Sequence, residues 1–389
     1  METFKYQLTN FIRYAGDAFF YPFLIYYLHY IGLDNSQSGL ILMIMPLVAI
    51  FINPIWSLFS KNVNYNRWFF SLLTIIEGIA VIFLVNAQAS LTLIILAIIL
   101  IAVVGQPIYV LLDSFTVTYT NQNKIEYSKI RVLGSVSYVI SSVLTGFIIY
   151  KEGYTVSFYI AAALMILSGL ILLSAKPLDL NNGLELNEKS NYKTLLKNKD
   201  FYIFGIFTIL SIGTMFAVDT YVPTFFKDIY HVNEMHYGFI FGSVILIEVI
   251  FMLLLAKFGK KIKKHYIYII IALSNIIKYI IFIIGGPLWL SIIGILFRGV
   301  SMSFYLYLFI STLSTIVEPK NLTLAAILIK SIDAFYKAGL IILGGYVTNN
   351  LDHYLIWFLL GCILNFISLF FVKYKNNHPN QIVIENMVK

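Results

Sequence analysis

The sequence predicts an all-α membrane protein with twelve membrane-spanning helices, and three observations lead to that prediction. Of its 389 residues, 59% are hydrophobic and only 12% are charged, with a mean hydropathy of +0.83. A soluble protein carries roughly 25% charged residues. Apolar runs long enough to cross a hydrocarbon core of ~30 Å recur along the chain. A single long polar stretch, KPLDLNNGLELNEKSNYKTLLKNKD, divides these runs into two sets of six.

The positions of the runs follow from hydropathy. In the first half they lie at about 8–31, 37–60, 68–86, 89–113, 128–150 and 154–175. In the second half they lie at about 200–225, 237–256, 265–284, 287–312, 321–347 and 353–373. The first run is too long and too polar for a cleavable signal peptide, so it is interpreted as a spanning helix. The expected parts are an N-terminal six-helix bundle (1–175), a central cytoplasmic loop (176–199), a C-terminal six-helix bundle (200–374) and a cytoplasmic tail (375–389).

Basic residues are distributed unevenly between alternate loops. With both chain ends placed in the cytoplasm, nineteen of the 27 Lys and Arg residues fall in inner loops and tails, and only Lys151 and Lys227 fall in outer loops. Cytoplasmic loops of membrane proteins carry such an excess. We therefore expect a multi-pass protein of the cell membrane with both termini in the cytoplasm. The same bias accounts for the net charge of +8 without a nucleic-acid partner.

Twelve ionisable residues lie within the apolar runs. The six bases are Arg13, Arg131, Lys278, Arg298, Lys330 and Lys337. The six acids are Asp17, Glu77, Asp113, Asp219, Glu248 and Asp333. Each central charge costs roughly 2.5–3.5 kcal/mol, so the equal numbers predict pairing across a polar interior. A purely structural role, fixing helix register, remains open both for Arg13 with Asp17 and for the one-sided stripe of the eleventh run.

The segment YSKIRVLGSVSY (127–138) raises the question of what holds an arginine at the mouth of an apolar run. A guanidinium cannot be deprotonated in a protein, so Arg131 needs a partner. Tyr138 follows two helical turns later on the same face. An aromatic ring beside an arginine suits a solute that has an apolar face together with hydroxyls or a charge. The first run adds Asp17 and, one turn further, Tyr21.

This pattern resembles the major facilitator superfamily over essentially the whole chain: twelve spans, inner termini and a basic central loop between equal halves. The resemblance implies two six-helix bundles related by pseudo-symmetry. Within the superfamily, the lactose-permease-like branch of oligosaccharide, nucleoside and phenylpropionate-type proton symporters is most similar. FFYPFLIYYL resembles its aromatic–Pro–aromatic signature in the first helix, and INPIWSLFSKN resembles the end of its second helix.

The resemblance also implies a binding site. In lactose permease an acid on the fourth helix and an arginine on the fifth, eighteen residues apart, bind the sugar, and Asp113 and Arg131 have this spacing. Tyr138 stands where the permease has a tryptophan that stacks on the sugar ring. In the second half, Lys278 matches a ninth-helix arginine and Asp219 a seventh-helix acid. The expected solute-binding residues are Asp113, Arg131, Tyr138, Tyr21, Asp17, Lys278 and Arg298.

Other positions depart from the branch. Ser57 and Lys61 replace the Gly and Asp of the motif that follows the second helix. Arg298 replaces a tenth-helix histidine, and Ser301 stands where the coupling glutamate would be. The family's proton site is therefore not transferable. The residues expected to couple transport to an ion are Asp333, then Glu248, with Asp219, Lys330 and Lys337. By analogy the ion is a proton, with sodium left open, and no cofactor or metal is expected.

Several alternatives remain. A drug or metabolite exporter of the same superfamily would share the topology, although six intramembrane bases argue against lipophilic cations as its cargo. A sensor on a transporter fold would keep the helices and lose the charges. No enzyme is indicated: the histidines of HVNEMH (231–236) are spaced i, i+5 and do not share a helix face. Sugars, nucleosides and aromatic acids all remain open as solutes, with glycosides slightly favoured. A monomer is expected, with a dimer left open.

Overall fold

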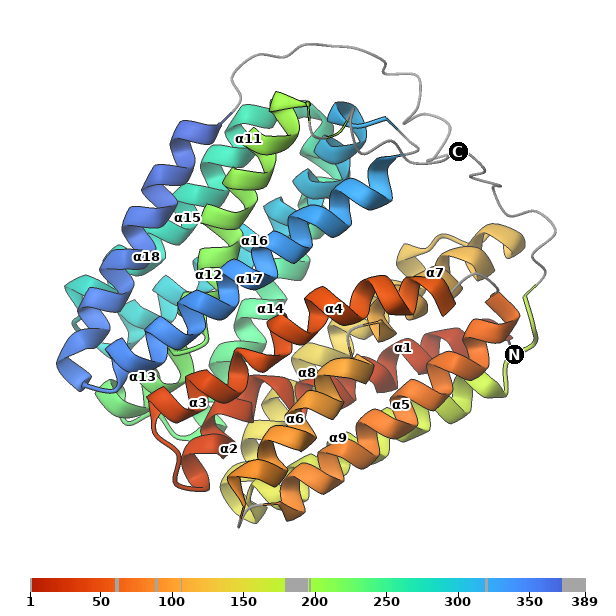
Figure 1. Ribbon diagram of the computed structural model, residues 1–389, viewed down its shortest axis with the longest axis horizontal. Coiled ribbons are helices and arrows are strands. Elements are labelled where there is room, and N and C mark those ends of the chain that lie inside the picture. Colours follow the sequence, from red (N-terminus) through yellow and green to blue (C-terminus); the bar gives the residue numbers. More distant parts are fainter. Residues whose placement is uncertain are drawn as a thin grey trace. The chain divides into compact units, whose positions relative to one another are not determined.

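The computed structural model describes residues 2–59, 63–87, 90–105, 107–178, 195, 197–318 and 321–372, and these residues contain helices and no β-strand. The first half (Figure 1) contains α1 (Glu2–Ala18), η1 (Tyr21–Phe23), α2 (Leu24–Tyr30), α3 (Asn35–Leu42), α4 (Ile44–Phe59), α5 (Val63–Asn86), α6 (Leu91–Gly105), α7 (Ile108–Asn123), α8 (Ser128–Glu152) and α9 (Tyr154–Leu173). The second half contains α11 (Lys199–Thr208), η2 (Ile209–Gly213), α12 (Thr214–Asp219), α13 (Val222–Tyr230), α14 (Glu234–Phe258), η3 (Gly259–Lys261), α15 (Lys264–Ile284), α16 (Leu288–Ile316), α17 (Leu322–Thr348), η5 (Leu351–His353), α18 (Tyr354–Ser368) and η6 (Leu369–Phe371).

Every apolar run expected from the sequence corresponds to helical residues, and the all-α membrane fold is confirmed. Among the described residues, nine helices are long and apolar enough to cross a membrane. The first, fourth and eleventh expected runs are not among the nine. The first is broken into α1, η1 and α2, the fourth contains the short helix α6, and α17 carries Lys330, Asp333 and Lys337. A hydropathy criterion therefore misses three expected spans, because of a helix break, a short helix and three ionisable residues.

The expected fourth run, 89–113, is wrong at its end. The structure has two helices there, α6 and α7, and α7 continues through the polar sequence TVTYTNQN to Asn123. Pro107 occupies the N-cap position of α7, where its missing N–H costs no hydrogen bond. The helix ends where Lys124 adopts a left-handed backbone conformation, with φ of 53°. Hydropathy identifies the end of the apolar residues, but the helix continues beyond them to Asn123.

Proline interrupts the first helix of each half. Pro22 lies in the short 3-10 turn η1 between α1 and α2, and Pro223 lies in the first turn of α13, after α12. Because proline lacks an amide hydrogen, a helix that reaches it must end or bend. The two halves therefore share a break in corresponding helices, as expected for two related bundles.

The described helices group into two compact units. Unit 1 comprises Met1–Gly183, Ala217–Leu246 and Lys337–Trp357, and unit 2 comprises Leu184–Phe216, Ile247–Tyr336 and Phe358–Lys389. Unit 1 thus includes one end of α14 and one end of α17 in addition to the first half of the chain. The division at 176–199 and the tail at 375–389 remain predictions, because most of the former and all of the latter lie outside the described residues.

Within unit 1, close helix packing depends on small residues. Helix α5 packs along α9, and α1 packs against both α8 and α9 (Figure 1). A Cβ atom on Gly78 of α5 would lie 2.7 Å from the carbonyl oxygen of Ala162, and one on Gly16 of α1 would lie 3.3 Å from that of Ala161. Such approaches are typical of membrane helices that pack through glycine. As a result, α1 and α5 both lie against α9, with Asp17 and Glu77 next to these glycines.

Hydrogen bonds at one end of unit 1 join helices from both halves of the chain; we call this the closed end (residues 26–39, 221–238 and 341–354). Asn35 Nδ2 donates to the Thr348 carbonyl oxygen at 2.8 Å, and Tyr26 Oη donates to the Pro223 carbonyl oxygen at 2.7 Å. Asn35 lies directly after Asp34, whose capping box with Gln37 starts α3. The capping box thus places Asn35, which makes the contact to Thr348, at the first residue of α3.

Backbones also meet closely beside the closed end. A Cβ atom on Gly146 of α8 would overlap the Glu234 carbonyl oxygen of α14 and lie 3.1 Å from Gly238 Cα. On α3, a Cβ atom at Gly39 would lie 3.3 Å from Gly345 Cα of α17. No larger side chain fits at these crossings unless the helices separate, so the glycines permit the contact.

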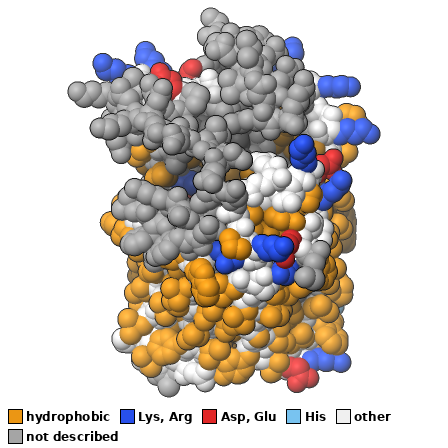
Figure 2. All heavy atoms as spheres, turned by 90° about the vertical axis from the view of Figure 1, so that its right-hand side faces the viewer, with side chains coloured by type: hydrophobic (Ala, Val, Ile, Leu, Met, Phe, Trp, Pro, Cys, Tyr) orange, Lys and Arg blue, Asp and Glu red, His pale blue; other side chains and the backbone are white. Residues whose placement is uncertain are grey.

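Large hydrophobic side chains are exposed along the helices. Leu96, Phe239 and Phe335 are 51%, 53% and 71% exposed. Figure 2 shows a face on which hydrophobic side chains form a broad band, with most of the visible Lys and Arg side chains beyond one edge of it. An exposed apolar surface of this extent is unfavourable in water and suits contact with lipid.

Candidate functional site

Asp113 and Arg131 lie together in unit 1. Asp113 projects from α7 and Arg131 from the first turn of α8, and Arg131 Nε lies 3.7 Å from Asp113 Oδ1. The Tyr127 hydroxyl, just before α8, donates to the same carboxylate oxygen at 2.9 Å. The Asp113 and Arg131 side chains are 45% and 32% exposed. One acid balances one base, and both groups retain exposed surface that a solute could cover.

The position of Arg131 depends on Tyr14 and Gly134. Its guanidinium carbon lies 4.3 Å from the centre of the Tyr14 ring, within the range of a cation–π interaction. Gly134 lies one turn further along α8. A Cβ atom there would lie 2.5 Å from Tyr14 Cδ2 and 3.2 Å from Arg131 Nη1. The Arg-x-x-Gly spacing therefore has a physical reason: only glycine leaves room for the ring beside the guanidinium.

Tyr138 lies two turns along α8 from Arg131 and is half-buried. Its ring centre is 6.3 Å from that of Phe241 on the unit 1 part of α14. Tyr138 thus belongs to the helix that carries Arg131 and contacts an aromatic residue from the other half of the chain.

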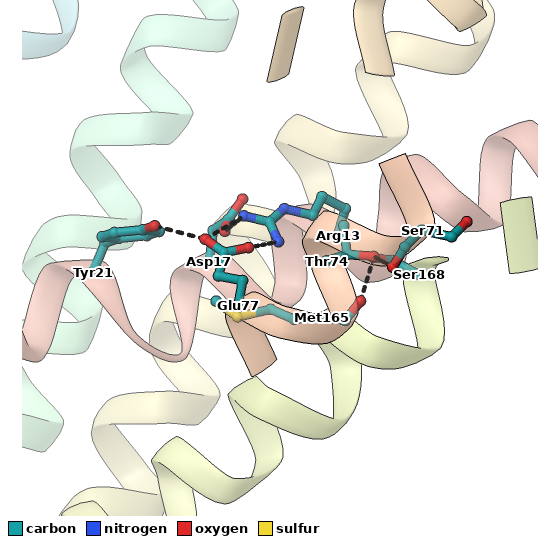
Figure 3. Close-up of polar contacts among 8 residues, drawn as sticks. All are labelled: Arg13, Asp17, Tyr21, Ser71, Thr74, Glu77, Met165 and Ser168. Atoms are coloured by element: carbon teal, nitrogen blue, oxygen red, sulfur yellow. Dashed lines mark hydrogen bonds and ion pairs between the residues drawn. The ribbon is translucent and has the colours of Figure 1, made fainter. Parts of the chain in front are cut away.

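Asp17 and Tyr21 belong to a different cluster, built around Arg13 and Glu77 (Figure 3). Arg13 forms a two-pronged pair with Glu77, in which Nη1 approaches Oε2 and Nη2 lies 3.1 Å from Oε1. Arg13 Nη2 also donates to Asp17 Oδ1 at 2.7 Å, and the Tyr21 hydroxyl donates to Glu77 Oε1 at 2.9 Å. We call Arg13, Asp17 and Glu77 the buried triad, because each side chain is at most 1% exposed.

Small residues and hydroxyls surround the triad. A Cβ atom on Gly105, the last residue of α6, would lie 2.9 Å from Glu77 Oε1, so glycine lets the carboxylate approach. Thr74 on α5 donates to the Ser71 carbonyl oxygen at 3.0 Å, and Ser168 on α9 donates to that of Met165 at 2.7 Å (Figure 3). These hydroxyls bind carbonyls of their own helices. Arg13 instead pairs with the two carboxyl groups.

Glu77 was not among the site residues predicted from sequence. The available signal was an acid in the run FFSLLTIIEGIAVIFLV, where a lone charge at membrane depth needs a partner. The i, i+4 spacing of Arg13 and Asp17 suggested a self-sufficient pair. The third member comes from α5 and is adjacent to them only in the fold.

In unit 2, Lys278 and Arg298 each contact an aromatic ring. Lys278 on α15 is fully buried, and its Nζ lies 4.4 Å from the centre of the Tyr279 ring. The guanidinium carbon of Arg298 on α16 lies 5.9 Å from the centre of the Phe216 ring. Asn275, one turn before Lys278, donates to Asn365 Oδ1 at 3.1 Å, which is a buried polar contact that the sequence analysis missed.

The residues expected to carry the coupling ion are divided between the units. Asp333, Glu248 and Lys330 belong to unit 2, and Asp219 and Lys337 to unit 1. Asp333 is nearly buried, Lys330 is exposed and the other three are half-buried. Their charges therefore do not form one cluster within either unit. The side chains of Ser57 and Lys61, named above as departures from the family motif, lie outside the described residues.

Asp333 lies against an unusual turn of helix. Residues Ile209–Gly213 form one turn of π-helix, η2, and a Cβ atom on Gly213 would overlap Asp333 Oδ1. The same hypothetical Cβ atom would lie 3.2 Å from Tyr336 Cδ1, one turn along α17. Single π-helical turns recur at functional sites. The glycine in this turn leaves space for the carboxylate.

Comparison with known proteins identifies the family. The model of the Major Facilitator Superfamily matches residues 8–335. The chain belongs to the major facilitator superfamily. A curated relative, the "Uncharacterized transporter YwbF" of Bacillus subtilis (strain 168), is 23% identical over 335 residues, covering 85% of this chain and 82% of the relative.

Solved structures share the fold. The nucleoside transporter NupG superposes with TM-scores of 0.81 for a mutant and 0.77 for the unmodified protein, at 16% and 17% identity. Each superposition covers 96% of this chain, with 100% and 99% of the respective NupG chains. A D-xylose-proton symporter has a TM-score of 0.72 at 13% identity, with coverage of 96% of this chain and 97% of the other. The chain is thus a multi-pass membrane protein of a transporter family, with the fold that the resemblance implied.

Proposed function

We propose that this superfamily member is a secondary active transporter that carries a small polar organic solute, a sugar or glycoside or a nucleoside, together with a proton. The observation that carries the proposal is the Asp113–Arg131 pair. It is electrically balanced, and each side chain keeps about a third or more of its surface exposed. A pair of this kind offers both a hydrogen-bond acceptor and a forked donor to a hydroxylated solute.

Tyr138 extends the proposed site. A half-buried ring on the helix of Arg131 offers an apolar face on which a sugar or a base can stack. In the proposal Asp113, Arg131 and Tyr138 bind the solute, and Lys278 and Arg298 keep the solute-binding role predicted from the sequence. The names of two structural relatives, a nucleoside transporter and a D-xylose-proton symporter, support these solute classes.

The closed end supports transport by alternating access. Helices α3 and α17 meet through Gly39 and Gly345, and α8 meets α14 through Gly146 and Gly238. Under the proposed topology, with both termini in the cytoplasm, this end faces outward. The proposed cycle opens these contacts to admit a solute and re-forms them to release it on the other side.

The proton-coupling role proposed from the sequence stays with Asp333 and Glu248, with Asp219, Lys330 and Lys337 as charged neighbours. A carboxylate binds a proton more tightly as it is desolvated and less tightly near a cation. Motion that changes its neighbours therefore changes its proton occupancy. One proton moving inward through ~100 mV supplies roughly 2.3 kcal/mol.

Counterflow uptake into proteoliposomes tests the proposed function. Purified protein would be reconstituted and assayed with labelled sugars, nucleosides and aromatic acids. We expect at least one sugar or nucleoside to be taken up, and Asp113→Asn or Arg131→Lys to lower its uptake roughly tenfold or more. Glu126→Gln is the control, because Glu126 forms an exposed pair with Lys129 and is 72% exposed. Intact uptake in both site variants, for every transported solute, would refute the site. Accumulation only in inside-out vesicles would indicate an exporter.

A further inference from the structure

The buried triad holds unequal numbers of acidic and basic groups. Arg13 supplies one positive charge, and Asp17 and Glu77 supply two carboxyl groups, all essentially without exposed surface. If both carboxyls were ionised, the cluster would carry one uncompensated negative charge. An unbalanced buried charge costs several kcal/mol, which the group avoids by taking up a proton. One proton makes the triad neutral.

The hydrogen bonds indicate which carboxyl group takes the proton. Glu77 accepts from both terminal nitrogens of Arg13 and also from the Tyr21 hydroxyl. Asp17 accepts from Arg13 through Oδ1 and interacts with the Tyr109 hydroxyl, and its buried Oδ2 is left without a hydrogen bond in the described part of the chain. Donors aimed at a carboxylate stabilise its ionised form. Glu77 therefore has the stronger support for its charge, and Asp17 Oδ2 is the oxygen free to carry hydrogen.

Among the described residues, the neighbouring elements contribute no second base in contact with Asp17. From α1 come Arg13 and Tyr14, and the α7 residue Tyr109 lies with its ring centre 5.5 Å from the Arg13 guanidinium carbon. Tyr21 comes from η1. From α9, Figure 3 shows Met165 and Ser168, neither of which titrates in the accessible pH range. Within the described residues the charge on the cluster is set by Arg13 and the two carboxyl groups.

We propose that the buried triad is a proton-binding site and that Asp17 carries one proton on Oδ2 in this conformation, with Arg13 and Glu77 ionised. The site differs from the coupling residues proposed from the sequence, because its members lie on α1 and α5, which carry none of those residues. Asp17, expected above to bind solute, acquires a different role.

Contacts link this site to the solute site. Tyr14 contacts Arg131 on one side, and its ring centre lies 5.9 Å from that of Tyr109, which contacts Arg13. A solute that moves Arg131 would move the pair of rings next to the triad. The inference that the bound proton is the one used for coupling rests on the proposed function. The inference that the triad binds a proton does not depend on the proposed function.

Infrared spectroscopy of the full-length protein in lipid nanodiscs tests the proton directly, without solute. A protonated carboxyl group has a C=O band distinct from that of a carboxylate, and the band shifts in D₂O. We expect such a band at neutral pH. Labelling aspartate side chains with ¹³C should shift the band, and labelling glutamate side chains should leave it in place. A band that follows the glutamate label, or the absence of any aspartate-derived band, would overturn the assignment.

Three variants assign the band to the triad. Asp17→Asn removes the carrier and should remove the band. Glu77→Gln leaves one acid and one base, so Asp17 should ionise and the same band should disappear. Asp113→Asn is the matched control, because it removes an acid from the balanced, half-exposed pair, and the band should persist. A band that survives both triad substitutions would place the proton elsewhere.

These measurements separate the two proposals. If no solute is transported but the aspartate band is present and depends on Glu77, the proton site stands and the proposed function fails. If solute is transported and the band is absent, the function stands and the proton site is refuted. The labelled unmodified protein gives an answer even if a substituted chain does not fold.

Discussion

Arg13 and Arg131 lie on helices that pack together, α1 and α8, and they solve the same physical problem in opposite ways. Arg13 has no exposed surface and is bound to two carboxyl groups. Arg131 is 32% exposed, faces one carboxylate at 3.7 Å and rests on the ring of Tyr14. The first guanidinium is enclosed by protein, and the second keeps part of its surface free.

A fully buried charge and a half-exposed charge at membrane depth need different surroundings. A fully buried charge must have its partners built in, because leaving it unpaired costs several kcal/mol. A half-exposed charge is solvated by water and can exchange that water for a ligand. The buried triad suits a permanent electrostatic function, and the Asp113–Arg131 pair suits reversible binding.

The largest expected effect is the loss of stability on removing the buried arginine. Arg13→Gln leaves two buried carboxyl groups without their base and should lower the free energy of unfolding by about 3–5 kcal/mol. The same substitution at the partly exposed site, Arg131→Gln, should cost no more than about 1 kcal/mol. Denaturant titration of the purified protein in detergent measures both. Equal losses at the two positions would contradict the comparison.

A compensating substitution sharpens this prediction. Adding Glu77→Gln to Arg13→Gln removes one of the abandoned carboxyl groups. We expect the double variant to be more stable than Arg13→Gln alone, which gives a non-additive cycle. Additive losses would mean that Arg13 and Glu77 contribute independently despite their two-pronged contact.

The ranking should reverse when function is measured. Asp113→Asn should change the free energy of unfolding by less than about 1 kcal/mol, because the pair is half-exposed. It should nevertheless lower solute uptake roughly tenfold or more, which corresponds to the loss of one charge-assisted hydrogen bond. Uptake into proteoliposomes and unfolding of the same preparation give the two values. A variant that loses stability and uptake in proportion would indicate a structural pair.

A smaller effect is expected where Tyr14 packs on Arg131. Gly134→Ala brings a methyl group within 2.5 Å of the Tyr14 ring, so the ring must shift, at a cost of about 1 kcal/mol. Gly339→Ala on α17 is the matched control, since no heavy atom lies within 4 Å of the added Cβ. That variant should gain about 0.4–1 kcal/mol. Thermal unfolding compares them, and a Gly134→Ala chain as stable as Gly339→Ala would show that Tyr14 is not held in place.

The sequence predicts most of the fold because hydropathy, loop charge and helical spacing are local properties. It places all twelve runs on helical residues, and it suggests the association of Asp113 with Arg131 through their eighteen-residue separation in a related family. It misses the end of α7, because a helix that leaves the membrane continues through polar residues such as Thr120 and Asn123.

The buried triad could not be predicted for a different reason. Its members lie at positions 13, 17 and 77, and what brings them together is the packing of α1 and α5 against α9. That packing depends on Gly16 and Gly78, which the sequence presents as two of 23 glycines. Counting the ionisable residues within the apolar runs gave six acids and six bases and implied that each charge there is balanced. The structure shows that one local group has an extra acid.

The smallest effect is expected at the start of α1, where an ion pair between Glu2 and Lys5 is partly exposed, with 22% and 21% of the two side chains accessible. Glu2 accepts a hydrogen bond from the Lys176 backbone N–H at 2.8 Å and lies 3.0 Å from Lys5 Nζ. The Lys176 hydrogen bond, followed by that of Lys5, lowers the pKa of Glu2 below its usual value of 4.5. Because the folded-state pKa is the lower one, the contribution of Glu2 to stability is present above pH 4.5 and is lost as the pH falls through the folded-state pKa.

Glu2→Gln should therefore lower the thermal midpoint slightly near neutral pH, and the difference from the unmodified protein should shrink as the pH is lowered past 4.5. Glu126→Gln is the control, because Glu126 forms the same kind of i, i+3 pair with Lys129 but the two side chains are 72% and 66% exposed. Compared with the buried triad, the Glu2–Lys5 pair shows how much partial exposure to water weakens an ion pair. A Glu2→Gln difference that grows at low pH would reverse the sign and exclude the Lys176 contact as its source.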